Sequence, residues 1–218
     1  MPGLFITMEG PDGAGKTTVI EKLIPLLEER TNVTITSTRE PGGSRIAEDI
    51  RQIILDVQNV EMDVRTEAIL YAAARRQHLT DRILPNLEKG GIVFCDRFVD
   101  SSLVYQGVAR GIGVEAVYQL NQFATAGKTP DVTLYLDVPA EIGLERIHLA
   151  KGNRQFDRLD QEGLQFHKMV RQGYLDIIPT DPERFIQIDA TKTVDEVVQE
   201  CLTALVERYP EYFTNGER

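Results

Sequence analysis

Short apolar runs alternate with longer amphipathic stretches along this chain of 218 residues. Most runs are continuous and rich in β-branched or aromatic residues, as in strands that are covered on both faces of a sheet. Because helical stretches separate the runs, the pattern predicts an α/β fold with a parallel, doubly wound sheet that binds ligands at the carboxyl ends of its strands. The predicted strands are Leu4–Met8, Val33–Ser37, Gly91–Cys95, Val132–Leu136 and Arg184–Ile188.

The stretches between and after these runs place apolar residues at helical spacing. In the first stretch the apolar positions are 19, 20, 23, 24, 26 and 27, and Pro25 among them predicts a kink or a short break. The chain has neither an internal repeat nor a low-complexity linker, so we expect a single domain over 1–218. Helices are predicted over 17–30, 44–56, 64–88, 114–126, 140–150, 161–178 and 193–207.

The first predicted strand leads directly into a glycine loop, Gly-Pro-Asp-Gly-Ala-Gly-Lys-Thr-Thr over 10–18, which fits the pattern G-x-x-x-x-G-K-[ST]. Glycines let successive backbone N–H groups surround phosphate oxygens that a Cβ would obstruct. The lysine then reaches the β- and γ-phosphates, the threonine hydroxyl binds Mg²⁺, and the next helix directs its N-terminal dipole at the same anion. We therefore predict a nucleotide-phosphate site at Gly10, Pro11, Asp12, Gly13, Ala14, Gly15, Lys16, Thr17 and Thr18.

Charged residues follow the second and third predicted strands. Asp96 stands where a P-loop protein presents a second carboxylate near the metal, although a helix N-cap is an alternative. Arg97 offers a planar guanidinium suited to a phosphate, or it forms a structural ion pair. Arg39 precedes a Pro-Gly-Gly turn and, taken alone, fits a plain connection. Ligands bound at the strand ends would meet these three side chains.

Two further stretches are candidates for a base-binding site and for a mobile loop. Tyr71 and Arg75 are four residues apart and share one helix face, where a ring could stack on a base and a guanidinium could hydrogen-bond its edge. Taken alone, Tyr71 is more often a core residue than a ligand. The polar stretch 151–160 fits either a mobile loop or an ordinary surface loop.

Charge and composition narrow the class of protein. The formal net charge is −10, and the chain has no basic cluster long enough to follow a nucleic-acid backbone, so nucleic acid is not an expected partner. Cys95 and Cys201 are too few for a disulfide framework, and Cys95 fits a buried thiol. We see neither a signal peptide nor an apolar stretch of membrane-spanning length, and therefore expect a cytoplasmic protein without a membrane partner.

Together these segments resemble the bacterial thymidylate kinases over nearly the whole chain. Each segment is weak evidence alone, apart from the glycine loop, but their order and spacing are highly specific. The resemblance implies a P-loop NTPase fold, with a five-stranded parallel sheet flanked by helices and a mobile lid at about 150–160. The segments that carry it are 9–18, 39–43, 70–75, 96–101, 104–107, 130–137 and the pair Asp157-Arg158.

The resemblance also implies an activity, which is transfer of the γ-phosphoryl group of ATP to dTMP, giving dTDP. ATP and dTMP would be the partners, Mg²⁺ the cofactor and a homodimer the assembly. Carried over by position, Asp12 takes the dTMP 3′-hydroxyl, and Arg39 and Arg97 hold the dTMP phosphate. Tyr71 stacks on thymine, and Arg75 reaches its O4 edge.

The remaining roles are implied in the same way. Ser102 and Gln106 flank the base, and Tyr105 packs near C2′ and disfavours a ribose hydroxyl. Thr17 and Asp96 belong to the metal site. The glycine loop carries no basic side chain between Gly10 and Gly15, so the resemblance places a catalytic arginine in the lid. The implied catalytic residues are Lys16, Arg97, Arg154 and Arg158.

Two departures and two rival functions accompany this resemblance. The family usually has Phe where Tyr71 stands, and often Tyr or His where Phe98 stands. One rival is a kinase for another nucleoside monophosphate. The other is a non-enzymatic P-loop switch, although the guanine-reading motif N-K-x-D of GTPase switches is missing from the sequence. For Asp157 and Arg158, the alternative to a catalytic role is a structural salt bridge with each other or with the next helix.

Overall fold

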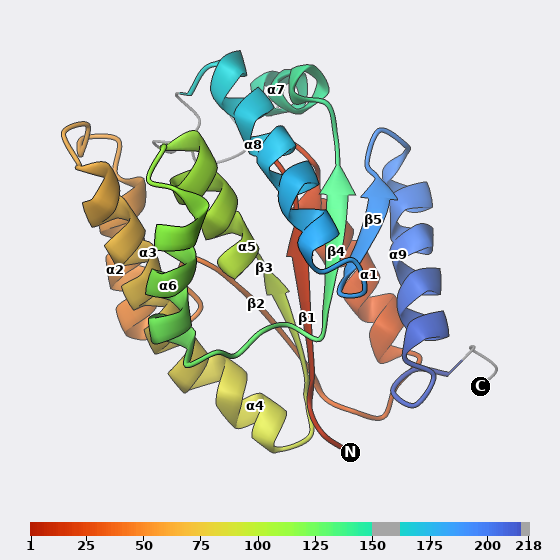
Figure 1. The fold of residues 1–218 in the computed structure, drawn as a ribbon. Helices are drawn as coiled ribbons and strands as arrows, with labels where there is room; N and C mark the ends of the chain where they lie inside the picture. The colour runs from red at the N-terminus through yellow and green to blue at the C-terminus, as the bar shows by residue number, and fades with distance from the viewer. Residues whose placement is uncertain (150–161, 215–218) are drawn as a thin grey trace.

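Five parallel strands form one sheet in the order β2-β3-β1-β4-β5 (Figure 1). This computed structural model describes residues 1–149 and 162–214. The predicted α/β fold with a five-stranded parallel sheet is therefore confirmed, whereas the predicted lid lies outside the described residues. The strands are β1 Leu4–Glu9, β2 Ile35–Arg39, β3 Ile92–Asp96, β4 Val132–Asp137 and β5 Phe185–Asp189.

Each strand extends beyond its predicted end to one charged residue. The apolar pattern stops before that residue, because a charged side chain at the carboxyl end of a strand emerges from the core toward the ligand edge of the sheet. Strand β2 lies at the sheet edge and is only partly buried, and it begins two residues later than predicted. The charged terminal residues are Glu9, Arg39, Asp96, Asp137 and Asp189.

Helices cover both faces of the sheet (Figure 1). All seven predicted helical stretches contain a helix. The predicted helix 64–88 consists of α3, the π-helical segment η1 and α4 in succession. The bounds are α1 Lys16–Glu28, α2 Arg45–Leu55, α3 Val64–His78, η1 Leu79–Ile83, α4 Leu84–Glu88, α5 Val99–Ser102, η2 Leu103–Ala109, α6 Val114–Thr125, α7 Ala140–Leu149, α8 Leu164–Ile177, the 3₁₀ segment η4 Ile178–Thr180 and α9 Val194–Arg208.

Two details of the helices differ from expectation. Helix α1 continues through Pro25 without a break. The segment formed by α5 and the π-helical η2 was not predicted. It buries several polar side chains, and these interrupt the apolar periodicity by which a helix is recognised. The buried polar residues of this segment are Asp100, Ser101, Ser102 and Gln106.

The alternation of side chains along β1 divides the core into two layers. Leu4, Ile6 and Met8 pack with α1 and α9 on one face of the sheet. Phe5 packs against η1 and β3 on the opposite face, and α8 with η2 covers that face beside β4. Glu9 shares the parity of Phe5 and so faces the second layer. No helix among the described residues is long and apolar enough to cross a membrane.

Candidate active site

The glycine loop closes around the side chain of Lys16, whose Nζ donates to the carbonyl oxygens of Gly10 (2.8 Å) and Pro11 (2.9 Å). Burial, followed by the nearby charge of Arg97, lowers the pKa of Lys16 to about 8. Gly15 adopts the left-handed conformation, with φ +88°, and begins α1 without a side chain to cap it. The first N–H groups of α1 are therefore available to an anion.

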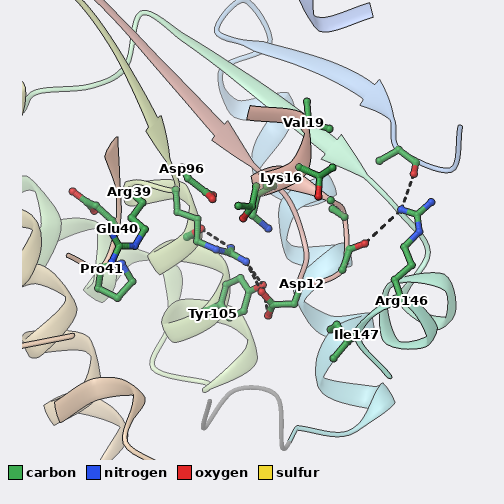
Figure 2. Close-up of a pocket in the computed structure, with 18 of the residues that line it drawn as sticks. Asp12, Lys16, Val19, Arg39, Glu40, Pro41, Asp96, Tyr105, Arg146 and Ile147 are labelled. Atoms are coloured by element: carbon green, nitrogen blue, oxygen red, sulfur yellow. Dashed lines mark hydrogen bonds and ion pairs between the residues drawn. The ribbon is translucent and has the colours of Figure 1, made fainter. Parts of the chain in front are cut away.

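A cavity of about 880 Å³ lies at the carboxyl ends of the strands (Figure 2). Every described residue of the predicted site lines this cavity except Gly10 and Pro11, whose carbonyl groups hold Lys16. Segments far apart in the sequence therefore meet here as predicted. The predicted residues that line the cavity are Asp12, Gly13, Ala14, Gly15, Lys16, Thr17, Thr18, Arg39, Tyr71, Arg75, Asp96, Arg97, Ser102, Tyr105 and Gln106.

Arg97 and Asp12 form an ion pair inside the cavity, with 2.5 Å between Nη2 and Oδ1. Tyr105 joins them, because its hydroxyl donates to Asp12 Oδ2 (2.9 Å) and its ring lies 4.9 Å from the guanidinium carbon. Burial alone would raise the pKa of Asp12, but Arg97 and Lys16 hold it below its ordinary value. Arg97 has φ +70°, a strained conformation for a residue with a Cβ. Such strain is common where a site fixes one side chain in place.

The other predicted phosphate ligand, Arg39, lies at the cavity edge and forms an ion pair with Glu48 of α2 (3.0 Å). About half of the Arg39 side chain is exposed, whereas Arg97 is largely buried. An anion in the cavity would therefore meet one fixed guanidinium and one that is partly in solvent.

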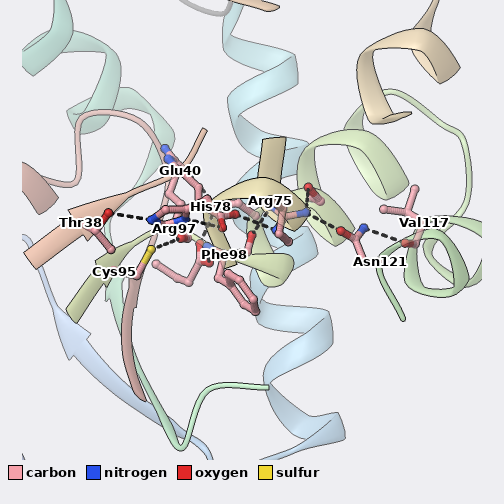
Figure 3. Close-up of polar contacts among 12 residues, drawn as sticks. Thr38, Glu40, Arg75, His78, Cys95, Arg97, Phe98, Val117 and Asn121 are labelled. Carbon is pink, nitrogen blue, oxygen red and sulfur yellow. Dashed lines mark hydrogen bonds and ion pairs between the residues drawn. The ribbon is translucent and has the colours of Figure 1, made fainter. Parts of the chain in front are cut away.

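Arg75 lies at the centre of a buried hydrogen-bond network (Figure 3). Its Nε donates to Glu40 (2.7 Å), its Nη2 donates to the carbonyl of Phe98 (3.0 Å), and its Nη1 donates to Ser102 (3.1 Å) and Asn121. A guanidinium has five N–H groups, so these four bonds leave one N–H on Nη2. The network fixes the plane of Arg75, which suits recognition of a single acceptor.

Glu40 links Arg75 to His78 and, through it, to Thr38 (Figure 3). Oxygen, nitrogen and sulfur atoms of Glu40, His78 and Cys95 lie within 4.8 Å of one another, as in a metal site. Each is already hydrogen-bonded, however, and burial raises the pKa of Cys95 well above its ordinary value, which keeps a thiol rather than a thiolate. We assign this cluster to the support of Arg75.

Asp96 and Thr17 line the cavity as the predicted metal ligands. The Oδ1 atom of Asp96 is buried and has no hydrogen-bond partner in the described parts of the chain. A buried carboxylate oxygen without a partner is costly unless a ligand satisfies it, and Mg²⁺ binds oxygen ligands. The donor set present therefore fits Mg²⁺.

One end of the cavity was not predicted. Beyond Lys16 it is walled by Arg146 and Ile147 of α7 and by residues that follow β5. Arg146 is fixed by hydrogen bonds to the carbonyl groups of Ala190 (3.0 Å) and Gly13 (3.4 Å) (Figure 2). The rule that ligands lie at the carboxyl ends of strands could have pointed to the end of β5. The residues there are Ala190, Lys192, Thr193, Val194 and Val197.

A phosphate-binding glycine loop, a metal-ready carboxylate and an arginine cluster in one cavity define a P-loop phosphotransferase that acts on a second anionic substrate. A family model described as "Thymidylate kinase" matches residues 8–201. The chain is 55% identical to the thymidylate kinase of Lacticaseibacillus casei (strain BL23) over 213 residues, which is 98% of this chain and 100% of that protein.

Two further comparisons agree. The chain is 54% identical over 213 residues to the thymidylate kinase of Enterococcus faecalis (strain ATCC 700802 / V583), with the same coverage. The crystal structure of thymidylate kinase from Ehrlichia chaffeensis matches with a TM-score of 0.77 and 31% identity, over 94% of this chain and all of that chain. The chain belongs to the thymidylate kinase family.

Proposed function

We propose that this cavity carries out the reaction of the family, in which the γ-phosphoryl group of ATP is transferred to dTMP and gives dTDP and ADP. The protein is an ATP-dependent dTMP kinase. The observation that carries the assignment of the site is the presence of two anion-binding groups, Lys16 in the glycine loop and Arg97 opposite it, in the same cavity. Such a pair aligns a donor phosphate with an acceptor phosphate.

ATP occupies the end of the cavity formed by α1, α7 and the segment after β5. The glycine loop holds its phosphates through backbone N–H groups and Lys16. Its adenosine lies toward Arg146, beside the apolar side chains of Ile147, Val194 and Val197. A partly buried, hydrogen-bonded guanidinium and apolar walls suit the flat face of a base.

Bound dTMP occupies the opposite end, with its phosphate on Arg97 and Arg39. Tyr71 and Arg75 contact thymine from α3, and the single remaining N–H of Arg75 reaches O4. Ser102 and Gln106 of the segment from α5 to η2 flank the base. Asp12 exchanges its contact with Arg97 for the 3′-hydroxyl when the phosphate arrives, and Tyr105 packs near C2′.

The chain's own residues contribute charge and alignment, because phosphoryl transfer needs little covalent help from a protein. Lys16 binds the donor phosphates, and Arg97 holds the acceptor phosphate in line. Asp96 and Thr17 would hold Mg²⁺, which when bound neutralises phosphate charge. Arg154 and Arg158 are proposed to supply further positive charge at the transferred group, and both lie outside the described residues.

The acceptor is tested by steady-state ADP release with a panel of nucleoside monophosphates and ATP. We expect dTMP to give the highest kcat/KM. A higher kcat/KM with another monophosphate would assign this cavity to that acceptor. ADP release that does not depend on any monophosphate would favour a nucleotide switch.

We also propose that the protein is a homodimer. Large apolar side chains are exposed on α2, α3 and α6, which lie together beside β2 and β3 (Figure 1). Phe123 is the extreme case, with 89% of its surface exposed. A second copy of the chain would cover this face, because a patch of this kind is unfavourable in water. The apolar residues are Ile46, Ile53, Val64, Ile69, Val114, Tyr118 and Phe123.

We also propose that the protein is cytoplasmic. Cys95 and Cys201 are both buried free thiols. Reduced cysteines are typical of compartments in which thiols are kept reduced.

A further inference from the structure

Glu9, the last residue of β1, is a buried acid that the glycine-loop motif does not include. Its side chain is fully buried and faces the layer formed by α5, η2 and α8. We propose that Glu9 is a positioning residue: it orients the two hydroxyl groups that hold Arg97, and thereby sets the affinity of the kinase for the phosphate of dTMP. The inference rests on the proposed role of Arg97 as the phosphate ligand.

The carboxylate of Glu9 accepts three hydrogen bonds. Oε1 accepts from the backbone N–H of Phe98 (2.7 Å), and Oε2 accepts from the hydroxyl groups of Ser101 (2.5 Å) and Tyr174 (2.8 Å). A backbone N–H can only donate, and a carboxylate can only accept. The hydroxyl oxygens of Ser101 and Tyr174 also lie 2.9 Å apart, but an ionised carboxylate is the stronger acceptor, so both hydroxyl hydrogens point toward Glu9.

The same two hydroxyl oxygens contact Arg97. Its Nη1 donates to Ser101 Oγ (2.9 Å) and to the Tyr174 hydroxyl oxygen (3.4 Å). Because the hydrogens of both hydroxyls are directed at Glu9, their lone pairs are directed at the guanidinium. Without an acceptor at position 9, either hydroxyl could turn its hydrogen toward Arg97 and repel it.

Glu9 also fixes the backbone at Arg97. The bond from Phe98 N restrains the peptide that follows Arg97, and Arg97 has φ +70°. A strained conformation persists only where neighbouring contacts enforce it. On the other side, Asp12 and Tyr105 contact Nη2. Glu9 thus controls the face of Arg97 that points into the protein, and leaves the Asp12 side for exchange with a substrate.

This arrangement is that of the ionised Glu9, which prevails above its pKa. Burial, followed by the carboxylate of Asp100, raises the pKa of Glu9 to about 7. The positive charge of Arg97 acts in the opposite direction. The negative charge of Glu9 in turn acts to raise the pKa of Lys16, against the larger effect of burial. The Glu9 carboxylate is therefore a costly group for the fold, and such a cost is typical of a functional position.

The direct test replaces Glu9 by Gln and measures binding of dTMP and of thymidine by calorimetry above the pKa of Glu9, which is raised to about 7, so that the parent protein carries the carboxylate. Glutamine has the same shape, but its amide must donate where the carboxylate accepted. We expect Glu9→Gln to weaken dTMP binding about tenfold or more and to leave thymidine binding and the KM for ATP unchanged within about twofold. Equal weakening of dTMP and thymidine would overturn the inference, because it would show a general distortion of the cavity.

Two sets of variants complete the test. In an Arg97→Ala background, Glu9→Gln should produce no further loss of dTMP affinity, since its effect passes through Arg97. Additive losses would overturn the inference. If Arg97→Ala alone leaves the preference for dTMP over thymidine intact, the proposed role of Arg97 fails instead, so the two failures are distinguishable.

Tyr174→Phe keeps the test decisive if Glu9→Gln does not fold, because it removes one oriented hydroxyl and no charge. It should also weaken dTMP binding selectively, and an unchanged dTMP affinity would contradict the inference. Asp137→Asn is the matched control. It alters a carboxylate at the end of the neighbouring strand β4 that pairs with Arg171 instead, so it should leave the ratio of dTMP to thymidine affinity unchanged.

Discussion

At the scale of single residues, we predict that the donor half of the site depends on Lys16. Its ammonium should stabilise charge that develops on the transferred phosphoryl group, so Lys16→Ala should lower kcat by about a hundredfold or more. Steady-state kinetics measure the effect, and circular dichroism checks that the variant is folded. The matched control is Lys22→Ala on the outer face of α1, where Lys22 makes an exposed ion pair with Asp195. A near-normal kcat for Lys16→Ala would overturn the P-loop assignment.

Glu9 gives the stability of the protein a definite pH dependence. Its pKa rises from 4.5 to about 7 on folding, so the native state binds more protons than the unfolded state between these values. The free energy of unfolding should therefore fall as pH rises from about 5 to about 7, by at most about 3 kcal/mol. Glu9→Gln cannot titrate, so urea unfolding of both proteins across this range isolates the effect. A difference in stability that is constant with pH would contradict it.

At the scale of elements, hydrophobic periodicity predicts most of the fold. It locates all five strands, because continuous apolar runs bounded by polar residues are typical of strands covered on both faces. It does not locate α5 and η2, since the polar residues buried there interrupt the apolar periodicity. The same limit applies to Glu9 and Arg146. Neither belongs to a local motif, and their roles depend on partners distant in sequence, Tyr174 for Glu9 and Ala190 for Arg146.

We propose that the stretch between α7 and α8 supplies positive charge to the transferred phosphoryl group. The glycine loop has no basic side chain between Gly10 and Gly15, so further charge at the transferred group must come from elsewhere. We predict that Arg154→Ala or Arg158→Ala lowers kcat at least about tenfold with a modest change in dTMP affinity. Single-turnover kinetics measure the rate of the transfer step in each variant. Normal turnover of both single variants and of the double variant would show that neither arginine is catalytic.

At the scale of the whole molecule, the apolar face of α2, α3 and α6 predicts self-association. Phe123→Asp places a charge on the most exposed apolar side chain of that face and should reduce the mass in solution from twice 24.5 kDa to 24.5 kDa. Size-exclusion chromatography with light scattering measures it. Leu149→Asp is the control, because Leu149 is 77% exposed on α7, away from that face. A monomeric parent protein would refute the proposed homodimer.

The proposed function places a donor phosphate and an acceptor phosphate in the same cavity. The most direct test follows labelled phosphate from [γ-³²P]ATP in a rapid-quench single turnover with dTMP. We expect the label to appear in dTDP in a one-to-one ratio with ADP, and no ADP to form at a comparable rate without dTMP. Label released as inorganic phosphate, or ADP formed independently of dTMP, would contradict the assignment of this cavity to phosphoryl transfer between the two nucleotides.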